Sequence, residues 1–499
     1  MNKSIMVQGT MSNVGKSILV AGLCRIFKQD GYSVAPFKSQ NMALNSFITA
    51  DGLEMGRAQV MQAEAAGIEP QAIMNPILLK PTSSVGSQVI VNGEVIGNQK
   101  ADEYIAYKEQ LRGVVKEAYN TLASEYDIVV LEGAGSPAEI NLREYDLVNM
   151  GMAKMTQSPV LLAGDIDLGG VFAQLYGTVQ LFSEDDRSML KGLLINKFRG
   201  DIDILKPGLI DLERLCGVPV VGLAEYMDLD IDDEDSLAPR LDESSASAVL
   251  DIAVVRLPHL SNFTDFNQLS RHRDIGVRYV TDAESLGRPD LVIMPGTKNT
   301  MADMRWLWES GLARCIKKLS SGNTPIIGIC GGYQMLGEAM SDPDGVETGG
   351  DIEGLALLPM RTIFTPEKTR TRTSATLHLP SDSFFASLDG MALEGYEIHM
   401  GRTEGSCPSS VVLHMQSGDV FDGGAKGTVL GTYLHGFFDA DGVVEKLAEL
   451  LLDIRGLTSK KATLENYTQH KERQYDLLAE GMRKHFDMEA IYKIVEAGI

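Results

Sequence analysis

Residues 3–17 read KSIMVQGTMSNVGKS, an apolar run that leads into a glycine-containing loop and a GKS triplet. The run Ser4–Gln8 predicts a buried strand, and the segment after Gly15 is expected to be helical. A strand, a glycine turn and a helix N-terminus together form an anion site, because backbone N–H groups and the helix dipole point to one place. This stretch therefore predicts a nucleotide phosphate loop in an α/β domain.

Five residues of this loop are predicted to hold the nucleotide: Gly9, Thr10, Gly15, Lys16 and Ser17. Lys16 would reach the β- and γ-phosphates, and the hydroxyl of Ser17 would bind Mg²⁺. The spacing departs from the usual GxxxxGK[ST] pattern, because the leading glycine comes one residue early and Thr10 takes its place. The expected strand and helix on either side still favour nucleotide binding over a plain strand–helix turn.

Further apolar runs alternate with helical segments through the first half of the chain, which is the pattern of a parallel sheet covered by helices. One helix is indicated by apolar residues that recur at three- and four-residue steps over 107–122. The other runs expected to form strands are Tyr32–Phe37, Asp127–Leu131, Pro159–Ala163, Lys191–Asn196 and Val218–Leu223.

Acidic residues follow two of these expected strands, where a magnesium–phosphate site would need them. Glu132 comes directly after one strand, and Asp165 and Asp167 follow the next. Ser17, Glu132 and Asp165 are therefore the predicted metal ligands. Asn196, at the end of a further strand, is a candidate to read the purine base. The alternative for each acid is a helix cap or a solvated loop residue.

The segment 226–250 is acidic, rich in small residues and without a helical or strand period, which predicts a linker between a first domain, 1–225, and a second, 251–450. The segment 451–499 is expected to be a helical tail. Glycine- and threonine-rich segments before Tyr433 favour antiparallel strands. The runs expected to form strands in the second domain are Asp251–Leu257, Gly276–Val280, Asp290–Pro295, Pro325–Ile329 and Thr428–Leu434.

The second domain contains a candidate nucleophile in the string GICGG, residues 328–332. Glycines on both sides of Cys330 permit the sharp strand-to-helix turn that presents a nucleophilic side chain, and a thiol at a helix N-terminus is favoured as a nucleophile. His435 ends an apolar strand and is followed by a glycine, which makes it the best-placed base. The alternative for Cys330 is a buried packing residue. The backbone N–H groups of Gly296 and Gly331 are candidates for an oxyanion hole.

The chain has 499 residues, a formal net charge of −23 and five cysteines without a CxxC pair. Its length predicts two or three domains, and its acidity argues against nucleic acid or an anionic membrane as a partner. No apolar run is long enough for a membrane span, and the first residues do not form a secretory signal. We expect a soluble protein of a reducing, cytoplasmic compartment that acts on small molecules.

Several long strings resemble the cobyric acid synthase family. They are GTMSNVGKS (9–17), PFKSQNMALNS (36–46), NPILLKPT (75–82), EGAGSPAEINL (132–142), INKFRGD (195–201), MPGTKNT (294–300), GICGGYQMLG (328–337), GYEIHMGRT (395–403) and TYLHGFF (432–438). The resemblance implies two domains: a dethiobiotin-synthetase-like phosphate-loop ligase and a class I-like glutamine amidotransferase. It also implies amidation of the b, d, e and g carboxylates of (adenosyl)cobyrinic acid a,c-diamide with ATP, Mg²⁺ and glutamine.

The resemblance assigns roles to particular residues. Cys330 matches the glutaminase nucleophile, His435 its base, and Lys38 a lysine of the ligase site. Ordinary class I amidotransferases carry a glutamate two residues after the histidine, whereas Phe437 stands there in this chain. The sequence therefore leaves open what orients His435. It also leaves open which residues contact a corrin and how many copies of the chain assemble.

Three alternatives remain at this point. The nearest is the related enzyme that amidates the a and c carboxylates of the same ring system, which has a similar architecture. A second is a partition- or regulator-type ATPase, which shares the unusual phosphate loop but has no glutaminase half. A third is a glutamine-dependent ligase for another polycarboxylate. Cys330 and His435 argue against the ATPase, and the strings GYEIHMG and SQNMALNS favour the cobyric acid synthases over the first.

Overall fold

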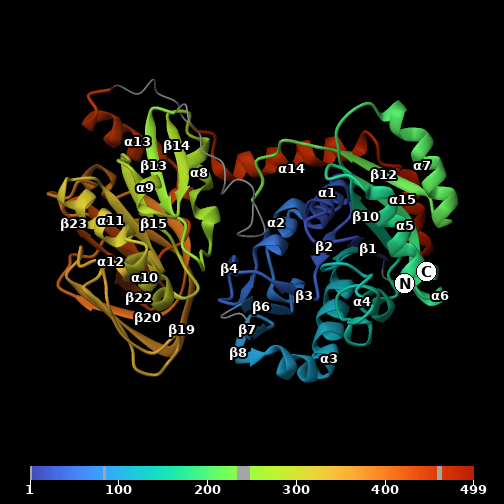
Figure 1. Ribbon diagram of the computed structural model, residues 1–499, viewed down its shortest axis with the longest axis horizontal. Coiled ribbons are helices and arrows are strands. Elements are labelled where there is room, and N and C mark those ends of the chain that lie inside the picture. Colours follow the sequence, from blue (N-terminus) through green and yellow to red (C-terminus); the bar gives the residue numbers. More distant parts are fainter. Residues whose placement is uncertain (1–2, 82–85, 233–247, 458–463) are drawn as a thin grey trace. The chain divides into compact units, whose positions relative to one another are not determined.

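The computed structural model (Figure 1) describes residues 3–81, 86–232, 248–457 and 464–499. Contacts divide the chain into two compact units, and neither is continuous in sequence. Most of the predicted linker lies outside the described residues. The first unit comprises Met1–Ala43, Leu53–Asp232 and Thr468–Ile499, and the second comprises Leu44–Gly52 and Asp233–Tyr467.

The first unit is built on a parallel six-stranded sheet with the order β12-β11-β10-β1-β9-β2. Each strand that the sequence predicts in the first half is present in this sheet, so the predicted fold class is confirmed for this unit. The strands are β1 (Lys3–Gly9), β2 (Val34–Phe37), β9 (Ile128–Glu132), β10 (Val160–Asp165), β11 (Leu190–Phe198) and β12 (Val220–Glu225).

Helices cover both faces of this sheet (Figure 1). One face packs against α1 (Lys16–Gln29), α2 (Arg57–Ala66), α14 (Tyr467–Arg483) and α15 (Met488–Ala497). The other face carries α3 (Ala101–Glu125), α4 (Met150–Thr156) and α5 (Val171–Leu181), and the remaining helices are α6 (Glu184–Met189) and α7 (Ile202–Cys216). The helix expected over 107–122 is the central part of α3. The described part of the predicted tail, 451–457 and 464–499, is mostly helical, and residues 468–499 belong to the first unit instead of following the second.

The segment between β2 and α3 contains small elements that hydrophobic periodicity did not predict. Four of its strands form a separate sheet with the order β3-β6-β7-β8. These strands have three to seven residues, which is too short for a clear alternation signal. The elements are β3 (Gln40–Met42), β4 (Ser46–Ile48), β5 (Glu54–Gly56), η1 (Ala72–Met74), β6 (Ile77–Pro81), β7 (Gly86–Val91) and β8 (Glu94–Lys100).

The second unit has a six-stranded sheet with the order β14-β13-β15-β16-β24-β23, parallel except for β23. Its strands are β13 (Leu250–Val255), β14 (Ile275–Val280), β15 (Leu291–Met294), β16 (Ile326–Ile329), β23 (Gly424–Lys426) and β24 (Val429–Thr432). Its helices are α8 (Asn267–Arg271), α9 (Ala283–Leu286), α10 (Thr300–Glu309), α11 (Leu312–Ser321), α12 (Gly331–Leu336) and α13 (Val443–Ile454). The predicted parallel strands are confirmed.

A second, largely antiparallel sheet completes this unit, as the sequence predicts for the region before Tyr433. Its strands are β17 (Ala339–Asp342), β18 (Gly350–Glu353), β19 (Met360–Leu377), β20 (Ala392–Gly405), β21 (Val411–Met415) and β22 (Gly418–Asp422). One continuous apolar core joins both sheets of the unit. No helix in the described part of the chain is long and apolar enough to cross a membrane.

Candidate active sites

The phosphate loop connects β1 to α1 and is held by backbone contacts. The Thr10 N–H donates to the Ala163 carbonyl at 2.9 Å, which ties the loop to the neighbouring strand β10. Gly15 has φ 89°, and a Cβ there would lie 2.3 Å from Nδ2 of Asn196. A side chain at this position would therefore be strained and would also displace Asn196.

Lys16 and Ser17 begin α1 and are 7% and 8% exposed. The Lys16 ammonium donates to the carbonyls of Met11 (3.0 Å) and Gly135 (3.2 Å), and the Ser17 hydroxyl donates to Oε1 of Glu132 at 2.9 Å. The lysine thus spans the loop where a phosphate would bind, and the serine connects the loop to the end of β9. The predicted residues Gly9, Thr10, Gly15, Lys16 and Ser17 lie together in this loop.

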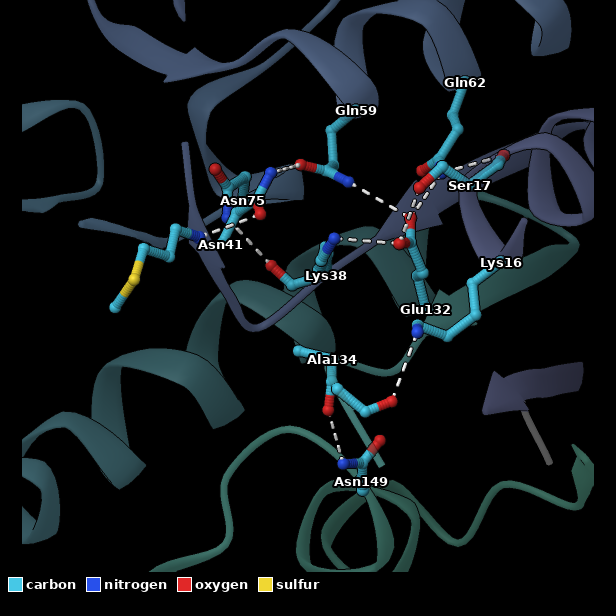
Figure 2. A network of polar contacts seen from close by, with 12 residues as sticks. Lys16, Ser17, Lys38, Asn41, Gln59, Gln62, Asn75, Glu132, Ala134 and Asn149 are labelled. Atoms are coloured by element: carbon cyan, nitrogen blue, oxygen red, sulfur yellow. Dashed lines mark hydrogen bonds and ion pairs between the residues drawn. The ribbon is translucent and has the colours of Figure 1, made fainter. Parts of the chain in front are cut away.

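Glu132 is the centre of a buried polar network (Figure 2). Its carboxylate accepts from Lys38 Nζ at 2.8 Å, from Gln62 Nε2 at 2.5 Å and from Gln59 Nε2 at 3.3 Å. Glu132 is 2% exposed and Lys38 4%, so their charges offset each other in a setting where a lone buried charge would be costly. Sequence reasoning identified Lys38 and Glu132 but missed both glutamines. Gln59 and Gln62 lie about one turn apart on α2, so both side chains reach the same carboxylate.

Asp165 and Asn196 lie at the ends of neighbouring strands, as predicted, and each already has a partner. The Asp165 carboxylate accepts from Lys197 Nζ at 2.7 Å and from the Asp167 N–H at 2.8 Å. The Asn196 amide donates to the Val14 carbonyl at 2.6 Å. Asn196 therefore braces the phosphate loop in this structure, while its predicted role in reading a base stays a prediction.

The residues around Glu132 suit a magnesium ion that is bound together with phosphate. Ser17 and Glu132 offer hard oxygen donors, and the buried Gln62 Oε1 has no hydrogen-bond partner among the described residues. Within the same described ranges, no group of three or more His, Cys, Asp and Glu side chains is arranged to hold a metal ion. A magnesium ion here would take phosphate oxygens and water as its other ligands.

The candidate nucleophile sits on a strained turn between β16 and α12. Cys330 has φ 53° and ψ −111°, a conformation that non-glycine residues rarely adopt. Its N–H donates to the Thr432 carbonyl at 2.8 Å, and its thiol lies 3.5 Å from the Ile398 carbonyl oxygen. Gly332 allows the close approach that this turn needs, because a Cβ there would lie 2.0 Å from the Met294 carbonyl oxygen.

His435 is buried beside the elbow, and Asp265 orients it. Its Nδ1 lies 2.7 Å from Asp265 Oδ2, and the other carboxylate oxygen accepts from the Gly436 N–H at 3.3 Å. Burial disfavours the charged imidazolium, but the negative charges of Asp265 and Cys330 outweigh this effect and raise the pKa of His435 to about 10. The imidazolium is therefore the dominant form at neutral pH. Its Nε2, the ring nitrogen that does not contact Asp265, is buried and makes no hydrogen bond to the described residues.

Aromatic and glycine residues surround this pair. The Tyr396 ring stacks on the His435 ring, with centroids 5.1 Å apart. Gly331 is the first residue of α12, directly after the nucleophile, and a Cβ on Gly296 would lie 3.2 Å from Cε1 of His435. The two predicted oxyanion glycines thus both lie next to the Cys–His pair.

Two family profiles match the chain. Residues 5–237 match the CobQ/CobB/MinD/ParA nucleotide binding domain, and residues 251–443 match the CobB/CobQ-like glutamine amidotransferase domain. The chain is 56% identical over 505 residues to the cobyric acid synthase of Ruminiclostridium cellulolyticum, covering 100% of this chain and 98% of that protein. The chain belongs to the cobyric acid synthase family. The nucleotide-binding and amidotransferase domains predicted from the sequence are thereby confirmed.

Other cobyric acid synthases match over a similar extent. That of Lachnoclostridium phytofermentans is 53% identical over 100% of both chains. That of Yersinia enterocolitica is 51% identical over 99% of this chain and 98% of that protein. The chain is thus similar to whole members of the cobyric acid synthase family and not to one domain of them.

In this cobyric acid synthase family member, Asp265 answers the question that Phe437 left open. Phe437 is buried in the core, and the carboxylate that bonds His435 comes from a segment 170 residues earlier. Asp265 lies in the short helix η4 (Phe263–Phe266), after the carboxyl end of β13. The sequence signal for Asp265 was weaker than that for Glu132, because Glu132 ends its strand whereas Asp265 lies in a short helix beyond the end of β13.

Proposed function

We propose that the chain amidates the b, d, e and g carboxylates of (adenosyl)cobyrinic acid a,c-diamide, giving cobyric acid with ATP and glutamine as co-substrates. The observation that carries the proposal is a buried His435–Asp265 pair beside the Cys330 elbow, in a chain that also has a phosphate loop bonded to Glu132. The full-length similarity to cobyric acid synthases supports the choice of a corrinoid as substrate.

Ammonia is released at the Cys330 elbow. The Cys330 thiolate attacks the side-chain amide carbon of glutamine, and the backbone N–H of Gly331 would bind the oxyanion. His435 then gives its Nε2 proton to the leaving ammonia, which produces a thioester. A water molecule that loses its proton to His435 hydrolyses this thioester to glutamate and restores the thiolate–imidazolium pair.

The carboxylate of the corrinoid must be activated before ammonia can displace an oxygen. Transfer of the γ-phosphoryl group of ATP gives an acyl phosphate, and ammonia then replaces phosphate to form the amide. In this proposal Lys16 neutralises the transferring group, and Ser17 and Glu132, which are hydrogen-bonded to each other, would hold Mg²⁺ with the nucleotide. Bound magnesium would supply charge stabilisation for the phosphates.

The variant Cys330→Ala tests the division of labour between the domains. Glutamine-dependent amidation should disappear, while a high ammonium concentration at alkaline pH should still support it, because the phosphate-loop unit is unchanged. Products are measured by mass spectrometry of the corrinoid. The matched control is Cys407→Ala, another thiol of the second unit that lies outside the elbow. Loss of the ammonia-supported reaction in a folded Cys330 variant would contradict the assignment.

A time course identifies the substrate. With cobyrinic acid a,c-diamide in excess over enzyme, one site that amidates four similar carboxylates should release intermediates with one to three new amides. Each amide should consume one ATP and one glutamine. A chain that stops after two amides when supplied with cobyrinic acid would instead be the enzyme for the a and c carboxylates.

We also propose a reducing, cytoplasmic compartment for this reaction. All five cysteines are free of disulfides, and the nucleophile has to stay reduced to act. Labelling of every thiol by a maleimide in denatured protein taken directly from cells would support this placement.

A further inference from the structure

Glu397 is a buried acid beside the glutaminase site, and the mechanism above does not use it. It lies on β20 and is 7% exposed. Within the described residues its carboxylate accepts no hydrogen bond, and its one charge-type contact is Nε2 of His399 at 3.9 Å. A buried carboxylate without a donor is costly, so a structure that keeps one is expected to have a partner that arrives from solution.

His399 does not supply that partner. Its Nδ1 lies 2.8 Å from the Gly401 carbonyl oxygen and therefore carries the ring proton, which leaves Nε2 as an acceptor. Burial lowers the pKa of His399 to about 4, so the ring is neutral at pH 7. Nε2 of His399 therefore faces the Glu397 carboxyl group across 3.9 Å, which is too long for a hydrogen bond between the two. A ligand with several N–H donors and a positive charge would satisfy both.

The position of Glu397 connects it to the reacting groups. The residue before it, Tyr396, stacks on the His435 ring, and the carbonyl of the residue after it, Ile398, lies 3.5 Å from the Cys330 thiol. Tyr396 and Ile398 pack on one face of β20, so Glu397 and His399 point to the opposite face. The His399 ring stacks there on Tyr433 with centroids 3.6 Å apart.

Other charges near Glu397 agree with a cation as its missing partner. Burial and the negative charge of Asp422 raise the pKa of Glu397 to about 8, while the charge of His435 acts in the opposite direction. Asp422 is already satisfied by the Thr432 hydroxyl at 2.6 Å and the Tyr433 N–H at 2.9 Å. A bound cation would favour the ionised form of Glu397 and restore its pKa toward the ordinary range.

We propose that Glu397, together with Nε2 of His399, binds the α-ammonium group of glutamine. The proposal rests on the function proposed above, in which glutamine is the nitrogen donor. An ammonium has three N–H donors and one positive charge, which matches one ring nitrogen that accepts and one carboxylate. The contact would make the site specific for the free amino acid, because a glutamine within a peptide has no α-ammonium group.

The test compares two nitrogen donors that differ only in this group. Glutamine and glutaramate, which lacks the α-amino group, are each hydrolysed by full-length enzyme, and ammonia release gives kcat/KM. In Glu397→Gln we expect the preference for glutamine to fall by about 30-fold or more, mainly through KM, with glutaramate changed by less than about 3-fold. Glu394→Gln, an exposed acid on the same strand, should leave both values unchanged.

Two other outcomes in Glu397→Gln overturn the proposal. An equal loss of kcat for both donors would assign Glu397 to support of the Cys–His pair, and an unchanged preference would remove it from substrate binding. Hydrolysis of glutaramate within about 3-fold of the unmodified rate shows that the second unit of the variant is folded. If the unmodified enzyme released ammonia from glutamine but did not amidate corrinoids, the proposed function would fail while this proposal stood.

The unmodified enzyme offers a second measurement that needs no variant. The ratio of kcat/KM for glutamine to that for glutaramate cancels the pH dependence of the reacting groups, which both donors share. This ratio should rise as the pH increases through about 8, where Glu397 ionises in the absence of ligand. A ratio that stays constant between pH 6.5 and 8.5 would overturn the proposal.

Discussion

At the scale of single residues, function depends on how charged side chains that are buried from water are stabilised by their partners. Glu132 and Lys38 are both almost fully buried, and the ion pair at 2.8 Å makes this possible. Asp265 does the same for His435, whose charged form would otherwise be lost to burial. In both cases the partner of a predicted residue comes from a distant part of the chain.

Replacing Asp265 by Asn removes the negative charge and keeps the shape. We expect the glutamine-dependent kcat to fall by about 10²–10⁴-fold, because the imidazole loses its orientation and its charge stabilisation. Since the charge of Asp265 raises the pKa of His435, its removal lowers that pKa. The alkaline loss of kcat should therefore move to lower pH.

The pH profile of kcat for glutamine hydrolysis measures this shift, and Asp344→Asn, an exposed carboxylate of the same unit, is the control. An alkaline limb at the same pH in Asp265→Asn and in the unmodified enzyme would show that Asp265 does not set the charge of His435. Amidation supported by ammonia should be retained.

At the scale of elements, both candidate sites use a turn from a parallel strand into a helix. β1 leads through the phosphate loop into α1, and β16 leads through Cys330 into α12. In each case a glycine removes a side chain from a point where backbone or a neighbouring side chain lies within 2.5 Å. The strand fixes where the loop starts, and the helix N-terminus provides N–H groups that point at an anion.

The variant Gly332→Ala tests this requirement at the elbow. An added Cβ would lie 2.0 Å from the Met294 carbonyl oxygen, so α12 must move away from β15. Glutaminase activity should fall by about 10²-fold or more, because small displacements of a nucleophile have large effects on rate. Calorimetry should also show a lower melting temperature for the second unit.

Gly113→Ala is the matched control in a helix. No atom lies within 4 Å of the added Cβ in α3, so removal of a helical glycine should raise stability by about 0.5–1 kcal/mol. If both alanine variants retained the activity and stability of the unmodified enzyme, close packing at the elbow would not be what restricts residue 332.

At the scale of the whole molecule, sequence order and compact units do not coincide. The segment Leu44–Gly52 follows Lys38 closely in sequence but belongs to the second unit, where Asn45 Oδ1 accepts from the Asn262 N–H at 2.8 Å. The Asn262 amide in turn contacts the Tyr396 hydroxyl at 3.2 Å. The C-terminal helices α14 and α15 likewise return to the first unit, where they share one apolar core with α1 and the sheet.

The variant Leu478→Ala tests the contribution of α14 to the first unit. Leu478 is 0% exposed in a core that includes residues of α1, so we expect a loss of about 2–5 kcal/mol in the free energy of unfolding. The neighbouring Leu477 is 42% exposed, and Leu477→Ala should change stability by less than about 0.5 kcal/mol. Urea denaturation of both full-length variants measures the difference. Equal effects would show that α14 does not stabilise this unit.

The sequence by itself determined the fold class, the phosphate loop, the elbow at Cys330 and the strand ends that carry Glu132 and His435. These features are local, because hydrophobic period, glycine spacing and strand boundaries are written in contiguous residues. The family followed from the same strings. Short strands between Gln40 and Lys100 gave too few residues for a period to emerge.

Only the tertiary structure decided which residues complete each site. Asp265 reaches His435 across 170 residues, Gln59 and Gln62 reach Glu132 of β9 from helix α2, and Glu397 is buried opposite His399. No local pattern contains such pairings, because they arise from how strands are ordered in the sheets and how helices pack on them. The tertiary structure also decided that α14 and α15 cover the first sheet, since an apolar helix face does not specify which core it joins.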